Sequence, residues 1–416
     1  MFYVGIDIAK RSHVACVMRE DNLLEIKPFA FSSSQAGFRK LQMQLLSLAC
    51  DVSEVFIGME ATGLLFDNLY RFLKALGYRV VLLNPYQTAK FREMDTMKRV
   101  KNDNIDAQMI AALIKSGRFS EGYVNDDQLQ SLRTLYRHRA SLDDQLKAIK
   151  RQTQTILAVV FPELEQVISD PFNVTGLALL EKYPTAKHYE YASAKRILKT
   201  FRSIKGNNFN EARANRLLTL SKESIYSGAG KEGYTATVRS NIKLMRLLKE
   251  QMHALETIML SLFDAKEATE EEQHEMRELI DNLRTIPGVS DKTILALLAE
   301  CGNLDRFHSA KALTGYLGLY PTLEQSGDTQ KNGRLAKRGA RLAKKAIYLA
   351  AIAAIRHNDE LRQVYRNYRS KGRAKKECII ITARKLLAII YAIYTHNVPY
   401  NPQRVFVASP NLSKRP

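Results

Sequence analysis

Cysteine is scarce in this chain of 416 residues, and its four cysteines lie far apart in the sequence. They are too scattered to form the closely spaced pairs of a zinc site or the framework of a small disulfide-linked domain. We therefore expect reduced and mostly buried thiols, as in a cytosolic protein. The four residues are Cys16, Cys50, Cys301 and Cys378.

Long apolar runs are also missing. The longest one, Ala346–Ile355, is far shorter than the roughly 20 residues that a membrane span needs, and Arg384 and Lys385 interrupt the next candidate. The N-terminal residues show no signal-peptide pattern, and the chain has no repeat of fixed period. These absences predict a cytoplasmic protein of a bacterial or archaeal cell, associated with the nucleoid and with no membrane.

Acidic residues are scarce in the last fifth of the chain. Residues 331–416 contain 20 lysines and arginines but 3 aspartates and glutamates, so this segment carries +17 of the net charge of +20. Such a local charge neutralises phosphates and releases counterions, which favours nucleic-acid binding. A solvated helix face and an anionic membrane surface are the alternatives. The expected contacts are Lys331, Arg334, Lys337, Arg338, Arg341, Lys344, Lys345, Arg373, Lys375 and Lys376.

The first 120 residues alternate strand and helix patterns, which predicts an α/β domain over residues 1–122. Apolar runs predict strands at Phe2–Ile8, His13–Met18, Glu25–Phe31, Glu54–Met59 and Tyr78–Leu83. Helical spacing predicts helices that begin at Ser34, span Leu65–Leu76 and end at Ser116. Three antiparallel strands followed by parallel strands with intervening helices is the order of an RNase H-like fold.

Four acidic residues stand at comparable points of this pattern. Asp7 and Glu60 end two apolar runs, and Asp103 and Asp106 are three apart on one face of a helix. The RNase H-like strand order places Asp7 beside Glu60. Clustered carboxylates bind Mg²⁺, and two such ions about 3.5–4 Å apart can activate the attacking oxygen and stabilise the leaving oxygen of a phosphodiester. Taken singly, each acid is more commonly a cap or a surface charge.

The middle of the chain, residues 123–265, has a helical pattern. Two long amphipathic helices, Asp126–Val160 and Thr235–Phe263, predict a coiled-coil arm that mediates oligomerisation. Packing of the first helix within its own chain is an equally good alternative. Residues 162–234 between them are mixed helical and carry no recognisable chemistry.

Residues 275–398 form a mainly helical C-terminal domain in this interpretation. The segment Leu283–Ser290 between two helices is typical of a helix-hairpin-helix, whose backbone N–H groups around Gly288 suit phosphate; an ordinary helical turn is the alternative. We then expect a polar loop, a basic helix, a basic loop, a final helix and an extended tail over residues 399–416. The three basic and polar segments are Tyr320–Gly333, Arg334–His357 and Arg366–Lys376.

Ser326 lies in the predicted polar loop, before Gly327 and close to Lys331 and Arg334 in the sequence. A hydroxyl group held among cations can attack a phosphate, because the cations stabilise the charge of the phosphorane. A serine before glycine in a polar loop is usually a turn residue. The residues alone therefore leave the role of Ser326 open.

Five motifs together resemble the DEDD transposases of insertion sequences, also described as bridge-RNA-guided recombinases. The resemblance covers about residues 1–120 and 280–350. The motifs are Gly-Ile-Asp-Ile-Ala-Lys at 5–10, Met-Glu-Ala-Thr-Gly at 59–63, Lys-Asn-Asp-Asn-Ile-Asp-Ala at 101–107, Ile-Pro-Gly-Val-Ser at 286–290 and Gln-Ser-Gly at 325–327.

The resemblance implies a RuvC-like domain with catalytic acids at Asp7, Glu60, Asp103 and Asp106, and a C-terminal transposase domain with the nucleophile Ser326. It also implies Mg²⁺ as cofactor, donor and target DNA as substrates, a noncoding bridge RNA that pairs with both, and a homo-oligomer, dimer or tetramer.

Two other functions fit parts of the sequence. A metal-dependent nuclease similar to a Holliday-junction resolvase would use the acids and water without Ser326. A binding protein without enzymatic activity would use the basic C-terminus and leave the acids unexplained.

Overall fold

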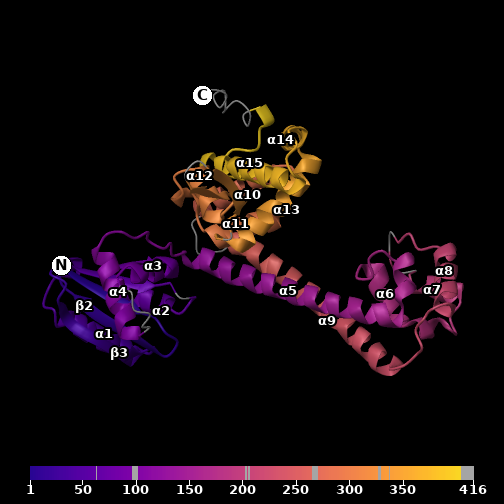
Figure 1. Cartoon of the computed structure of the whole chain (residues 1–416), viewed down its shortest axis with the longest axis horizontal. Helices are drawn as coiled ribbons and strands as arrows, with labels where there is room; N and C mark the ends of the chain where they lie inside the picture. The colour runs from indigo at the N-terminus through magenta and orange to yellow at the C-terminus, as the bar shows by residue number, and fades with distance from the viewer. Residues whose placement is uncertain are drawn as a thin grey trace. The chain divides into compact units, whose positions relative to one another are not determined.

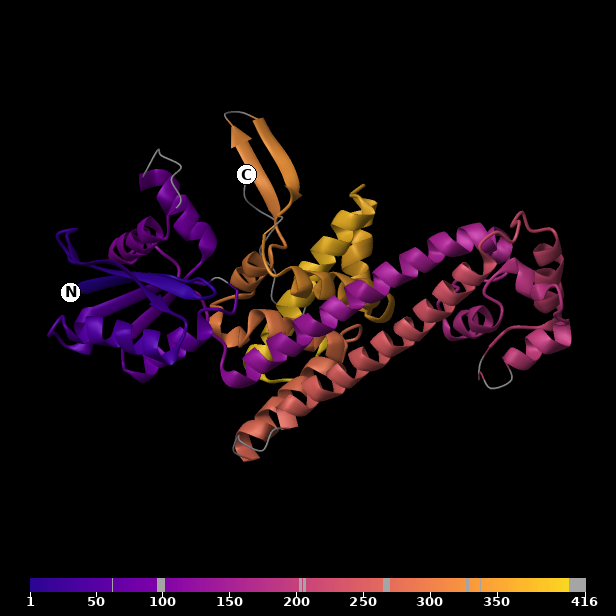
Figure 2. The same cartoon turned by 90° about the horizontal axis from the view of Figure 1, so that it is seen from below.

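The computed structural model describes residues 1–61, 63–95, 102–201, 204, 207–264, 270–326, 329–336 and 338–403 (Figures 1 and 2). It divides into two compact units, Met1–Val124 and Asn125–Pro416. The first unit is mixed α/β, and the second is mainly helical. Both classes agree with the prediction.

A five-stranded mixed sheet forms the centre of the first unit. Its strand order is β3-β2-β1-β4-β5. The first three strands are antiparallel, whereas β4 is parallel to β1 and β5 is parallel to β4. All five predicted strands are present, and β1 lies beside β4 as expected. The strands are β1 Phe2–Asp7, β2 Ser12–Met18, β3 Leu24–Ser32, β4 Val55–Glu60 and β5 Arg79–Leu83.

Helices cover both faces of this sheet. On one face, Leu41 and Leu45 of α1 and Leu69 and Leu73 of α2 share a core with β1 and β4. On the other face, α4 packs its apolar side against the same strands. Ser34 caps α1 as predicted, because its side chain accepts a hydrogen bond from the Gly37 N–H at 3.2 Å. The helices are α1 Gln35–Leu46, α2 Asp67–Ala75, α3 Pro85–Asp95 and α4 Asp103–Lys115.

Two paired glycines let α4 lie directly on the sheet. Gly5 of β1 stands in register with Gly58 of β4. A Cβ atom at Gly5 would lie 1.9 Å from the Ala107 carbonyl oxygen, and one at Gly58 would lie 2.6 Å from Cγ2 of Ile114. Both distances are far shorter than a van der Waals contact, so the helix approaches the strands only where they carry no side chain.

We predict that Gly5→Ala destabilises the first unit more than Gly58→Ala does. At Gly5 the new methyl group meets the backbone of α4, which must move as a whole, whereas at Gly58 it meets side-chain methyl groups of Ile114 and Ile110 and no backbone atom. The expected losses in free energy of unfolding are about 3 and about 1 kcal/mol. Denaturant unfolding of the full chain, followed by circular dichroism, measures both. Equal losses would mean that α4 does not hold this position.

His13 of β2 is a buried histidine in the apolar core. It is 1% exposed and packs against the rings of Phe31 and Phe38. Its Nδ1 accepts a hydrogen bond from the Ala9 N–H at 3.3 Å, and its Nε2 has no partner among the described residues. Burial lowers the pKa of His13 below its ordinary value.

The lowered pKa of His13 predicts that acid destabilises the first unit. Above the ordinary histidine pKa of about 6.5 both states are neutral, and below it the unfolded chain binds a proton that the folded chain resists. The contribution of His13 to stability is thus lost as the pH falls. His13→Gln, which cannot take up this proton, should show a smaller loss than wild type between pH about 8 and about 5. Parallel pH profiles would show that other groups cause the acid sensitivity.

Two long helices, α5 and α9, run side by side through the second unit (Figure 1). At one end they form a hydrophobic core with three shorter helices, and at the other end they join the core of the C-terminal helices. The region 162–234, which showed only a mixed helical pattern in the sequence, therefore belongs to a packed helical cluster. The helices are α5 Asp127–Val160, α6 Val174–Lys182, α7 Ala194–Thr200, α8 Glu211–Lys222 and α9 Lys231–Ser261.

The apolar stripe of α5 is covered within its own chain. Leu142 and Leu146 are buried in the core at the far end of the helix pair, and Leu135 packs against the C-terminal core. The alternative of packing within the chain is therefore the one observed. Because this stripe is buried within the chain, it does not support the predicted self-association through this helix.

The C-terminal helices surround a single core. Two predictions about this region are wrong. Residues Arg366–Lys376 are not one loop, because α14 continues to Ser370 and α15 begins at Lys375. Residues Tyr320–Gly333 are not a loop either, because they form most of a hairpin that extends from the helices (Figure 2). The elements are α10 Glu270–Arg284, α11 Asp291–Cys301, α12 Ala310–Leu317, β6 Pro321–Ser326, β7 Thr329–Leu335, α13 Arg341–His357, α14 Asp359–Ser370 and α15 Lys375–His396.

The physical reasons for these two errors differ. In α14 the apolar side, with the buried Leu361 and the half-buried Tyr365, packs on the core. These tertiary contacts stabilise a helix whose many charged residues hide the helical pattern in the sequence. In the hairpin, cross-strand backbone pairing makes a strand from a polar sequence without an apolar alternation. The predicted basic helix begins only at Arg341, because the residues from Arg334 to Leu335 belong to β7.

Helix α15 is long and apolar enough to cross a membrane by length and composition. However, 56% of its most apolar window is buried inside the second unit, with Leu386, Leu387 and Ile390 in the core. It has the features of the central helix of a globular unit.

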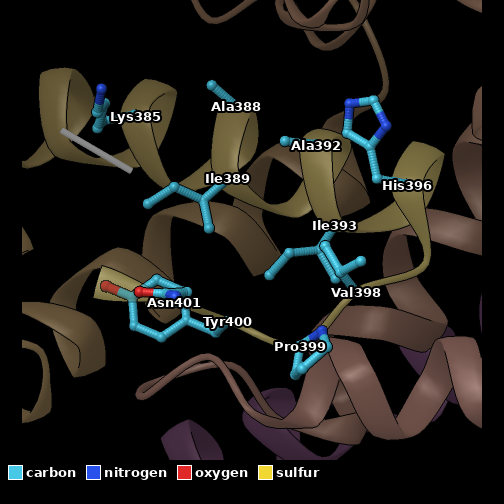
Figure 3. Close-up of a pocket in the computed structure, with 10 residues that line it drawn as sticks. All are labelled: Lys385, Ala388, Ile389, Ala392, Ile393, His396, Val398, Pro399, Tyr400 and Asn401. Carbon is cyan, nitrogen blue, oxygen red and sulfur yellow. The ribbon is translucent and has the colours of Figure 1, made fainter. Parts of the chain in front are cut away.

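The segment after α15 is anchored at its start by hydrogen bonds of Tyr400. The side-chain amide of Asn358 donates a hydrogen bond to the Tyr400 hydroxyl at 2.9 Å. The backbone N–H of Tyr400 donates one to the Thr285 hydroxyl at 2.8 Å. Residues 404–416 lie outside the described part. A groove of about 510 Å³ lies between this segment and α15 (Figure 3). Ile389, Ile393 and Pro399 line it, and no predicted site residue does.

Candidate catalytic site

Asp7 and Glu60 lie next to each other at one edge of the sheet. They end the neighbouring parallel strands β1 and β4, where Ile6 stands in register with Met59. Glu60 is oriented by α3, because the Thr88 hydroxyl donates a hydrogen bond to its Oε2 at 2.8 Å. The strand order thus brings together two acids that are 53 positions apart in the sequence.

Helix α4 adds acidic residues from its first turn. Its N-cap is Asn102, whose side chain accepts a hydrogen bond from the Asn104 N–H at 3.0 Å. Asp103 is exposed, whereas Asp106 is only 7% exposed. A carboxylate in this position is favoured by the positive end of the helix dipole. Because Ala107 lies over Gly5, two residues before Asp7, the start of α4 lies near the same end of β1.

Arg92 of α3 supplies the countercharge of Asp106. Its Nη2 lies 2.6 Å from Oδ1 of Asp106, and the two side chains are 26% and 9% exposed. Thr88 and Arg92 are one helical turn apart, so one face of α3 holds both Glu60 and Asp106. These two contacts confine the two carboxylates to one region.

The acid quartet is not assembled as a metal site in this arrangement. Within the described ranges, no group of three or more histidine, cysteine or acidic side chains is positioned to hold a metal ion. The donor chemistry nevertheless fits, since carboxylate oxygens from two strand ends and a helix are ligands that Mg²⁺ accepts. Release of Asp106 from Arg92 would make its Oδ1 available as a ligand.

Ser326 is the last residue of β6, in the second unit. Its backbone pairs with Thr329 across the hairpin. Lys331 and Arg334 lie on the opposite strand, β7. Residues 327 and 328, which follow Ser326 in the sequence, and the predicted contact Lys337 lie outside the described residues. The serine is therefore carried next to the tip of a hairpin.

Some of the predicted basic contacts form bonds within the protein, and two of these, Lys345 and Arg373, are nevertheless exposed. Lys344 is engaged, because its Nζ donates to the carbonyl oxygens of Ala336 at 2.9 Å and Arg338 at 2.8 Å, and burial lowers its pKa. Lys345 forms an ion pair with Asp143 of α5 at 3.3 Å. Arg373 forms one with Glu377. The exposed residues are Arg338, Arg341, Arg373, Lys375 and Lys376, with Lys345 also on the surface.

Gly288 has a packing role in the turn between α10 and α11. Its φ angle is +97°, and a Cβ atom there would lie 2.5 Å from the backbone of Ala354 in α13. A side chain at this position is excluded by both conformation and space. The structure therefore provides a reason for this glycine that does not involve a ligand.

Four residues of the site escaped the sequence analysis. Gly5 and Gly58 had a usable signal, since each stands two positions before an acid at the end of a predicted strand. Thr88 and Arg92 had none beyond a spacing of four, because their partners are decided by how α3 packs.

We predict that Arg92→Ala destabilises the first unit by about 3 kcal/mol, because it leaves the charge of Asp106 buried without this countercharge. The double variant Arg92→Ala, Asp106→Ala should recover part of this loss. Denaturant unfolding of the four proteins gives the coupling energy. Additive effects of the two substitutions would show that the pair contributes nothing to stability.

Two family profiles match parts of this chain. Residues 4–162 match a family profile described as "Transposase", and residues 280–366 match one described as "Transposase IS116/IS110/IS902 family". The first range contains the four acids, and the second contains Ser326.

Three relatives show the extent of the similarity. The insertion element IS900 uncharacterized 42 kDa protein of Mycobacterium paratuberculosis is 26% identical over 98% of this chain and 99% of that protein. The pilin gene-inverting protein of Moraxella bovis is 35% identical over 29% of this chain and 38% of its own length. The transposase for insertion sequence element IS1111A of Coxiella burnetii is 25% identical over 37% of this chain and 44% of its own length.

Proposed function

The chain belongs to the IS116/IS110/IS902 family of transposases, and we propose that it recombines donor and target DNA through a covalent bond between Ser326 and a DNA phosphate. It is thus an enzyme that acts on DNA. The observation that carries the mechanism is the meeting of Asp7 and Glu60 at neighbouring strand ends, with Asp106 of α4 held by the same helix that holds Glu60.

In this proposal the first unit is a RuvC-like domain in which Asp7, Glu60, Asp103 and Asp106 would hold Mg²⁺. When bound, two such ions would activate the attacking hydroxyl group and neutralise charge on the phosphate. Thr88 orients Glu60 by its hydrogen bond. Arg92 pairs with the buried Asp106 and would have to release it before Asp106 could hold a metal ion.

Ser326 acts as the nucleophile. Its Oγ forms a bond with the phosphorus atom, and the bond between phosphorus and the leaving strand's oxygen breaks, so that strand ends in a hydroxyl group. Attack of a hydroxyl group from another strand on the phosphoserine reverses the step and joins the strands. Lys331 and Arg334, on the strand that pairs with β6, supply positive charge in this hairpin.

The choice of DNA sites is proposed to lie with a noncoding bridge RNA. Exposed basic residues of α13, α14 and α15 would contact phosphates rather than bases; Arg341, Lys375 and Lys376 are among them. The turn at Gly288 would act as a helix-hairpin-helix that approaches a backbone. Two DNA partners must be held at once, so the working form is proposed to be a dimer or tetramer.

We predict that Ser326→Ala abolishes strand exchange and any denaturant-resistant protein–DNA adduct, while DNA and RNA binding persist. Alanine at Asp7, Glu60, Asp103 or Asp106 should also abolish cleavage, because each change removes a ligand. The test is incubation of the full chain with labelled DNA and Mg²⁺, followed by denaturing electrophoresis and by binding assays.

Two matched variants serve as controls. Glu54→Gln changes an exposed acid immediately before β4, away from the Glu60 end, and Ser141→Ala removes an exposed hydroxyl group on α5, in the same unit as Ser326. Both should cleave at the wild-type rate. If Ser326→Ala cuts normally and wild type forms no adduct, water is the nucleophile and the protein is a resolvase-like nuclease. If the acid variants cut normally, the acidic site has no role in catalysis.

A further inference from the structure

Three arginines lie near one carboxylate where α5 packs on α11. Arg133 and Arg137 are one turn apart on α5 and share a face. Arg306 follows α11, and Glu300 stands near the end of that helix. Electrostatic coupling links Arg133 to the other three side chains. This arginine cluster, Arg133, Arg137 and Arg306, therefore brings three guanidinium groups to the neighbourhood of Glu300.

The carboxylate of Glu300 is already used by one of the three. Arg137 forms a two-pronged pair with it, with Nε at 2.8 Å from Oε1 and Nη2 at 3.2 Å from Oε2. Glu300 is 6% exposed, whereas the Arg137 side chain is 47% exposed. The buried side of the cluster is therefore occupied by the Glu300 carboxylate, and part of the Arg137 side chain remains at the surface.

Arg306 is held in a fixed orientation by two aromatic rings. Its guanidinium carbon lies 4.2 Å from the ring centre of Phe307 and 4.6 Å from that of Tyr316. Its Nε donates to the Cys301 carbonyl oxygen at 2.9 Å. The Tyr316 hydroxyl in turn donates to the Glu300 carbonyl oxygen at 3.2 Å. A guanidinium fixed in this way loses little freedom when it binds an anion.

Arg133 lacks a partner that its position requires. Its Nε is buried and makes no hydrogen bond to the described residues. Burial lowers the pKa of its guanidinium, and the charge of Arg137 lowers it further. A buried donor without a partner costs about 1–3 kcal/mol, so a retained one calls for an acceptor from outside the chain.

The position of the cluster relates it to the hairpin. Tyr316 stands in the last turn of α12, which leads directly into β6 and Ser326. An anion bound by the cluster would lie near the base of the hairpin and outside the basic segment that begins at residue 331. Ser326 lies ten positions after Tyr316 in the sequence.

We propose that the arginine cluster binds a phosphodiester group of a nucleic-acid backbone. Guanidinium groups match phosphate oxygens in charge and in their planar pairs of donors. The surface of Tyr316, which is 39% exposed, adds an aromatic face beside the bound backbone. The proposal relies on the family's action on DNA but not on the Ser326 mechanism. DNA and RNA share the phosphodiester, and the test separates them.

The test measures binding of the full chain without divalent metal, so that cleavage plays no part. The probes are a fluorescein-labelled DNA duplex and a labelled RNA hairpin, titrated by anisotropy at several potassium chloride concentrations. Arg133→Gln and Arg306→Gln should each weaken binding about 5- to 10-fold and reduce the salt slope by about one for each lost phosphate contact. The probe that responds identifies the nucleic acid.

Arg151→Gln is the matched control. Arg151 is exposed on the same helix, α5, but lies beyond the cluster. Its loss removes the same charge and should change binding less than 2-fold. Equal effects of Arg151→Gln and Arg133→Gln, or wild-type affinity and salt slope in both cluster variants, would overturn the proposal. Circular dichroism monitors folding, and if Arg133→Gln unfolds, Arg306→Gln and Arg133→Lys decide. Arg133→Lys keeps the charge and should retain the salt slope with weaker binding.

Discussion

The contact between α4 and the backbone of β1 and β4 is the constraint on which the acidic site depends. It exists because Gly5 and Gly58 stand opposite each other in the sheet and neither carries a Cβ atom. The helix can then lie on the strands themselves, and its first turn comes near the strand end that carries Asp7. Any side chain at Gly5 would push the backbone of α4 away and would move Asp106 with it.

The second requirement of this site is countercharge. Acids gathered at a sheet edge repel one another, and a buried carboxylate is stable only with a compensating charge or hydrogen bond. Helix α3 provides both, through Thr88 on Glu60 and Arg92 on Asp106. The same contacts that stabilise the fold therefore place the acids.

In the second unit, positive charge is distributed according to packing. Some cations that the sequence groups together are tied to the protein itself: Lys344 closes a loop by binding two carbonyl oxygens, and Lys345 pairs with Asp143 of α5. Other charged residues that the sequence separates widely come together, since Arg137 of α5 pairs with Glu300 of α11. A count of charges along the chain therefore identifies a nucleic-acid protein more reliably than it identifies the contacts.

The sequence alone determined the class of each unit, the five strands of the sheet and the positions of Asp7 and Glu60 at strand ends, because these depend on local apolar periodicity and on a strand order with few alternatives. Only the tertiary structure decided the partner of Asp106, the covering of the α5 stripe by its own chain, the helical state of residues 366–370 and the hairpin that carries Ser326. Each of these depends on contacts between residues far apart in the chain, and no local pattern specifies such contacts.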